Sequence, residues 1–121
     1  MIDRYTLPRM QAVWDLKRKY EIWLEVELLA CEALEKAGQV PHGIAAKIRR
    51  RAKIDPDRIA AIEKVTKHDV IAFLESLAKP VGKNVRHLHQ GLTSSDIVDT
   101  ALAVQMGEAL DLILLDMEVL L

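Results

Sequence analysis

Two short stretches of the chain combine a helix-start signal with side chains that can bind an anion. In one stretch Thr66 is followed three positions later by Asp69, and in the other Thr93 is followed by Asp96. A hydroxyl residue with an acidic residue three positions on, ahead of an apolar run, is typical of a capping box at the start of a helix. The first turn of a helix has unpaired backbone N–H groups and the positive end of the helix dipole, which together receive anions.

Both predicted helix starts carry further donors. These are Lys67 and His68 at the first start, and His89, Ser94 and Ser95 at the second. Their ammonium, imidazole and hydroxyl groups suit a carboxylate or a phosphate. The alternative, that they only satisfy their own helix ends, stays open at this point. A shared site requires the two helix starts to meet in space and form one electropositive cradle.

Other kinds of site have little support in the sequence. His87 and His89 are two residues apart, a spacing that does not align two ligands on a helix, and no further Cys/His cluster has metal-ligand spacing. No Walker loop, GxGxxG pattern or nucleophile-elbow glycine pattern is present. We therefore expect neither a metal nor a cofactor.

The composition predicts an all-α protein. The 121 residues are 50% hydrophobic but 4% aromatic, so the core must be aliphatic, which favours helices over a β-sandwich. The net charge of −1 gives no argument for nucleic acid or a membrane as partner, and the basic run at 47–53 spreads around a helix as a solvated face. No signal peptide or bilayer-spanning stretch is expected. The single cysteine, Cys31, excludes an internal disulfide and fits a reducing, cytoplasmic location.

Hydrophobic periodicity and turn residues predict five helices after an arm that ends near Trp14. The expected ranges are about 15–37, 41–52, 55–66, a fourth from the cap at 66 to the proline at 80, and 93–121. Asp15 and Asp55 are the expected N-caps of the first and third helices, and Gly38 the residue just beyond the first. The connection 83–92 is expected to hold at most one helical turn.

The last predicted helix is apolar on nearly every face. A helix of this kind must be buried on most sides, and four shorter helices offer little to bury it against. The sequence ends at residues 119–121 (VLL) without a cap or a basic last turn. We therefore expect a fragment of a longer chain, or one part of an intimate oligomer whose helices cover this one.

The chain resembles the N-terminal part of the adenylosuccinate lyase family, within the fumarase/aspartase superfamily. The matching segments span nearly the whole chain and are residues 1–5, 23–27 with 30–33, 62–63 with 66–70 and 72–73, and 89–101. The Gly-Leu-Thr-Ser-Ser-Asp element at 91–96 is shared across the superfamily. The Arg-Tyr pair at 4–5 and the Thr-Lys-His-Asp element at 66–69 point more narrowly to this family.

The resemblance implies a β-elimination that cleaves a C–N bond. Adenylosuccinate would give AMP and fumarate, and the succinylcarboxamide intermediate of purine synthesis would react in the same way. The resemblance implies that Thr93 and Ser94 hold the succinyl carboxylates and that Arg4 and Tyr5 contact the nucleotide.

Four residues complete the site that the resemblance implies. Lys67, His68 and Asp69 line the same pocket, with His68 as the catalytic residue close to the chemistry. His89 lies near the phosphate, where a cationic imidazole suits a dianion.

The resemblance also implies an architecture and an assembly. Residues 1–92 form an N-terminal helical domain and 93–121 the start of a long central-bundle helix, in a homotetramer whose sites are shared between subunits. The family's general-acid histidine and general-base serine lie beyond this chain, so we expect the polypeptide alone to be inactive. The alternatives are another superfamily lyase, acting on argininosuccinate, fumarate or aspartate, and a non-enzymatic helical interaction module.

Overall fold

The computed structural model describes residues 2–121, so Met1 of the expected domain 1–92 lies outside the described residues. The described residues form helices joined by short connections, with no strand, which confirms the all-α prediction. In chain order the elements are the 3-10 helix η1 (Asp3–Tyr5), α1 (Pro8–Val13), α2 (Leu16–Lys36), α3 (Ile44–Arg51), α4 (Pro56–Thr66), α5 (Asp69–Val81), the 3-10 helix η2 (Gly82–His87) and α6 (Ser94–Leu120).

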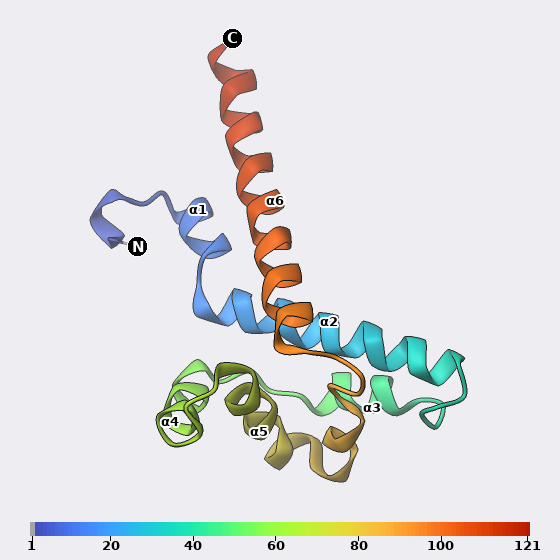
Figure 1. The fold of residues 1–121 in the computed structure, drawn as a ribbon. Coiled ribbons are helices and arrows are strands. Elements are labelled where there is room, and N and C mark those ends of the chain that lie inside the picture. The colour runs from blue at the N-terminus through green and yellow to red at the C-terminus, as the bar shows by residue number, and fades with distance from the viewer. Residues whose placement is uncertain (1) are drawn as a thin grey trace.

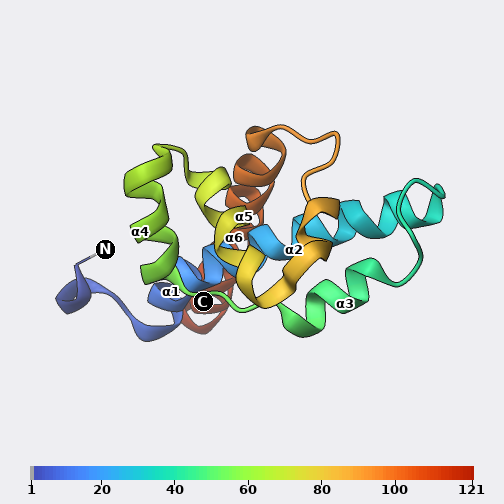
Figure 2. The ribbon, with the colours of Figure 1, turned by 90° about the horizontal axis from the view of Figure 1, so that it is seen from below.

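Two long helices, α2 and α6, cross and organise the others. The α4–α5 hairpin and α3 lie below α2, whereas α1 lies beside α6 above it (Figure 1). Seen from below, α3 and α4 lie at opposite ends of α2 (Figure 2). The second half of α6 extends beyond every other element (Figure 1).

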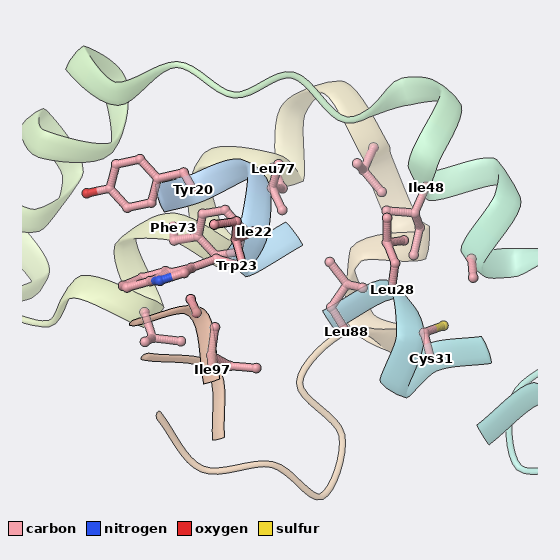
Figure 3. Packing of buried hydrophobic residues seen from close by; sticks show 14 of the residues in the cluster. Tyr20, Ile22, Trp23, Leu28, Cys31, Ile48, Phe73, Leu77, Leu88 and Ile97 are labelled. Atoms are coloured by element: carbon pink, nitrogen blue, oxygen red, sulfur yellow. The ribbon is translucent and has the colours of Figure 1, made fainter. Parts of the chain in front are cut away.

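An aromatic cluster joins α2 to α5. The rings of Trp23 and Phe73 meet edge to face with centroids 5.6 Å apart, and Tyr20 stacks on Phe73 at 5.9 Å. Ile97, in the first turn of α6, is fully buried in the same core (Figure 3). Val70, in the first turn of α5, is also buried there. One core therefore holds the beginnings of α5 and α6 in place.

Several predicted helix ends are confirmed. Asp55 caps α4, since its Oδ1 accepts a hydrogen bond from the N–H of Arg58 at 3.1 Å. Gly38 follows α2 in the left-handed conformation (φ 73°), which glycine adopts without steric cost. Asp15 occupies the N-cap position of α2, but its side chain makes no capping hydrogen bond.

The predicted role of Thr66 as a helix cap is wrong. Thr66 is the last residue of α4, Lys67 turns the chain in a left-handed conformation (φ 55°), and His68 is the N-cap of α5. The turn moves the start of α5 two residues onward, so Asp69 becomes its first residue. The Thr66 hydroxyl donates instead to the carbonyl of His68 at 3.1 Å.

Three further boundaries differ from the predictions. The arm contains the short helix α1, and the connection after α5 contains the six-residue helix η2, about two 3-10 turns rather than one. Pro80 lies inside α5 rather than ending it, and Gly82 (φ 71°) follows the helix.

The long last helix is confirmed and begins at the predicted capping box. Its last buried residue is Ala109, and large apolar side chains beyond it, such as Leu114 and Leu120, are exposed. No helix in residues 2–121 has the length and apolarity needed to span a membrane. The division between domains at residue 92 stays a prediction.

Candidate functional site

The first turns of α5 and α6 lie side by side. Nε2 of His68, the N-cap of α5, is 3.4 Å from Oγ of Ser94, the first residue of α6. Val70, the second residue of α5, and Ile97, the fourth residue of α6, are buried in the common core and fix this approach. The two predicted helix starts therefore meet in space, with the positive ends of both helix dipoles directed at one region.

His68 is oriented by the helix that it caps. Its Nδ1 accepts a hydrogen bond from the backbone N–H of Ile71 at 3.3 Å. A ring nitrogen that accepts carries no proton, so we assign the proton of the neutral ring to Nε2. Asp69 Oδ1 lies 3.6 Å from Nδ1, but it accepts from the N–H of Val70 at 2.7 Å, which is the shorter contact. The Nε2–H group of His68 is thus directed toward Ser94.

The first turn of α6 offers further donors. Thr93 and Asp96 form the predicted capping box, in which the Asp96 carboxylate accepts from the N–H of Thr93 at 2.8 Å. Helix geometry leaves the N–H groups of Ser94 and Ser95 outside the intrahelical hydrogen bonds. Together with two serine hydroxyls, they form an uncharged set of donors at a half-exposed position that suits an anion.

His89 is held by a residue that the sequence analysis did not single out. Both oxygens of Glu27, on α2, accept from His89: Oε2 from its backbone N–H at 2.7 Å and Oε1 from ring Nδ1 at 2.6 Å. Glu27 is completely buried. One sequence signal could have found it, because Glu27 follows Trp23 by four positions and so lies on the buried face of the predicted helix.

Two residues beside the paired helix starts have strained backbones. Lys67 (φ 55°) and His89 (φ 58°) are the non-glycine residues with positive φ in the part of the chain that is described. This conformation costs about 1–2 kcal/mol for a residue with a side chain, and strain of this kind clusters at functional sites. Lys67 is exposed and lies at the turn between α4 and α5.

Arg4 and Tyr5 are far from the paired helix starts. The Arg4 guanidinium donates to the Tyr5 hydroxyl at 2.8 Å, and Tyr5 lines a pocket with Leu112 and Asp116 of α6. Eighteen residues of α6 separate Ser94 from Leu112, a distance of about 27 Å along a helix. One copy of the chain therefore does not bring Arg4 and Tyr5 to the His68–Ser94 pair, and their contact with a nucleotide stays a prediction.

Comparison with known proteins groups this chain with lyases. A family model described as Lyase matches residues 4–121. Adenylosuccinate lyase from Synechocystis sp. is 47% identical over all of this chain, and that from Bacillus subtilis is 43% identical over 98% of it. The chain spans 28% and 27% of the length of these two relatives.

A solved structure gives the same picture of the fold. The crystal structure of fumarate lyase from Mesorhizobium sp. BNC1 superposes with a TM-score of 0.77 at 25% identity. The match covers 86% of this chain and 25% of that one. The helical arrangement of this chain thus belongs to a fold that is also found in this longer protein.

Proposed function

The chain belongs to the lyase family, and from this premise we propose that it carries the N-terminal part of an adenylosuccinate lyase. The reaction is the β-elimination of fumarate from adenylosuccinate, giving AMP, and from the succinylcarboxamide intermediate of purine synthesis. We place the enzyme in the cytoplasm. The observation that carries the proposal is the contact between His68 and Ser94, because it brings two helix N-termini to one place.

The chemistry of elimination explains why such a place is useful. Removal of a proton from the carbon next to a carboxylate moves negative charge onto that carboxylate. Fixed N–H and O–H donors stabilise the developing charge most when they are already oriented toward it. The hydroxyls of Thr93 and Ser94 and the free N–H groups at the start of α6 are donors of this kind and hold the succinyl carboxylates.

His68 acts as a catalytic hydrogen-bond donor through Nε2. Its Nδ1 is occupied by the N–H of Ile71, so the ring works in its neutral form with a single donor. Nε2 of His68 and Oγ of Ser94 are 3.4 Å apart, so the N–H and O–H groups at these atoms are close enough to donate to one substrate oxygen. Neutral imidazole held at a helix N-terminus is a known way to polarise an oxygen without a formal charge.

The remaining residues bind the nucleotide. His89 contacts the phosphate, and Lys67 and Asp69 line the same pocket. Arg4 and Tyr5 contact the nucleotide of a site in another copy, since one copy holds them about 27 Å from Ser94. From the resemblance to the family we further propose a homotetramer with shared sites, whose general acid and base lie in the portion of the relatives that this chain does not span.

A second candidate is another lyase of the superfamily, which the likeness to a fumarate lyase supports. The discriminating experiment assays the intact gene product with adenylosuccinate, argininosuccinate and aspartate, and measures fumarate release. We expect release from adenylosuccinate and an increase in melting temperature with AMP. Release from argininosuccinate or aspartate, without release from adenylosuccinate, would replace this proposal with the second candidate.

A further inference from the structure

We propose that Glu27 is a positioning residue that fixes the His89 ring so that Nε2 faces the phosphate of the nucleotide. The inference rests on the proposed function for the identity of the ligand. It adds a residue on α2 to a site whose other members lie at the starts of α5 and α6 and in the arm.

The burial of Glu27 demands an explanation. Its side chain has 0% exposure, and a carboxylate in such a position is costly unless its oxygens are hydrogen-bonded. Both oxygens are satisfied by a single residue, His89, through contacts of 2.7 and 2.6 Å. Within residues 2–121, His89 is also the one ion-pair partner of Glu27. The hydrogen bonds of this carboxylate in the described part of the chain thus both go to His89.

The two contacts fix different parts of His89. The contact to the backbone N–H holds the peptide in the left-handed conformation (φ 58°), and the contact to Nδ1 holds the ring. The preceding residue, Leu88, is buried beside Leu28 of α2, which anchors the connection next to Glu27 (Figure 3). A histidine held at both ends loses little further freedom when it binds a ligand.

The contact to Nδ1 decides which ring nitrogen is available. A carboxylate only accepts, so Nδ1 must carry a proton and donate it. Nε2 is then the free nitrogen, and the side chain is 23% exposed, so part of the ring reaches the surface. When the ring carries both protons, Nε2–H donates to a phosphate oxygen in a charge-assisted hydrogen bond. His89 and His68 are therefore held in opposite tautomers, by a carboxylate and by a backbone N–H respectively.

The first test measures the proton position directly. In the intact gene product labelled with ¹⁵N-histidine, we expect solid-state NMR at alkaline pH to place the His89 proton on Nδ1. Glu27→Gln keeps an oxygen for the backbone N–H but turns an amide NH₂ toward the ring, so the proton moves to Nε2. A wild-type proton on Nε2 would overturn the proposal. This measurement decides the matter even if the variant does not fold.

The second test asks whether the ring position matters for the phosphate. We expect Glu27→Gln to raise KM for adenylosuccinate about tenfold or more with kcat little changed, because a neutral amide does not stabilise the doubly protonated ring that donates a charge-assisted hydrogen bond to the phosphate. KM for the same compound without its phosphate should not change. Glu32→Gln, which alters a more exposed carboxylate on the same helix, is the matched control and should behave as wild type.

The outcomes separate this inference from the proposed function. If Glu27→Gln changes KM equally for the substrates with and without phosphate, Glu27 does not act through the phosphate and the inference is wrong. Combined with His89→Ala, Glu27→Gln should add no further change in KM. If wild type does not act on adenylosuccinate, the proposed function is wrong. If His89→Ala leaves KM unchanged, His89 does not bind the phosphate. In either case the inference about Glu27 is wrong as well.

Discussion

His68 uses its two ring nitrogens for different purposes. Nδ1 completes the start of α5 by accepting from Ile71, and Nε2 faces Ser94 across the gap between the helices. Under the proposed function, stability and activity therefore depend on different atoms of one side chain. Substitutions that remove one nitrogen function and keep the other can separate the two roles.

The replacement His68→Asn should remove activity and keep stability. Asparagine is among the best N-cap residues, so its side-chain oxygen can accept from Ile71, but it has no group at the position of Nε2. His68→Ala loses both the acceptor for Ile71 and the donor at Nε2, and the loss of the acceptor should lower the free energy of unfolding by about 1 kcal/mol. We expect each variant to lower kcat/KM by about 100-fold or more. Urea denaturation and steady-state kinetics of the intact gene product measure the two effects.

Two outcomes would contradict this division of roles. Near-normal activity in His68→Asn would show that Nε2 is not used in the reaction. Equal stability of His68→Ala and wild type would show that the contact between Nδ1 and Ile71 contributes nothing to folding.

Local patterns predicted some site residues and not others. The capping box at Thr93 was predictable because its two partners are three positions apart. The same pattern failed at Thr66, because the left-handed turn at Lys67 overrides it. The pairing of Glu27 with His89 joins residues 62 positions apart, so it depends on how α2 packs against the connection to α6.

Among the helices, α3 has an unusual start. Gly43 stands at its N-cap position in a left-handed conformation (φ 84°) and has no side chain to accept a hydrogen bond. Glu35 of α2 provides the acceptor instead. Its carboxylate accepts from the N–H of Ala45 at 2.6 Å and of Gly43 at 2.9 Å. One helix is thus capped by another, which ties the end of α2 to the start of α3.

This capping predicts a pH dependence of stability. The hydrogen bonds from Ala45 and Gly43 lower the pKa of Glu35 below its ordinary value of 4.5. The unfolded chain therefore binds this proton at higher pH than the folded chain does. The contribution of ionised Glu35 to the free energy of unfolding is complete above about pH 5 and is lost as the pH falls from there through the lowered pKa. Glu35→Gln should therefore make the free energy of unfolding depend less on pH in this range.

The measurement is urea denaturation of wild type and variant from pH 6 down to acid. Glu21→Gln, a change at an exposed glutamate earlier on α2, is the control and should leave the pH dependence as in wild type. An unchanged slope in Glu35→Gln would contradict the role of Glu35 as the cap of α3.

The helices were predictable from the sequence because their signals are local. Asp55 with Pro56, Gly38 after α2, and the recurrence of apolar residues every three or four positions are each signals within one element. The helix α1 was missed because six residues are too few to show a period. How α2 crosses α6 was not predictable, since it depends on contacts such as Arg18 of α2 to Glu108 of α6 at 3.2 Å, 90 positions apart.

For the molecule as a whole, α6 carries the strongest sign of assembly. Large apolar side chains along it, including Leu102, Leu110 and Leu114, are about half exposed. A continuous exposed apolar helix face is typical of a surface that other helices cover. This supports the proposed tetramer, and it gives a way for Arg4 and Tyr5 to reach a site in a neighbouring copy.

The proposed sharing of sites predicts that two inactive variants can restore each other. Tyr5→Ala and His68→Asn should each have little activity, but mixed tetramers should contain sites in which both residues are intact. We expect partial recovery when the two are co-expressed and the mixed tetramers are assayed for fumarate release. His68→Asn with Ser94→Ala should not recover, because those residues lie 3.4 Å apart in one copy and every site lacks one of them. Recovery in neither pair would place the functions of all three residues within a single copy, against the separation of about 27 Å along α6.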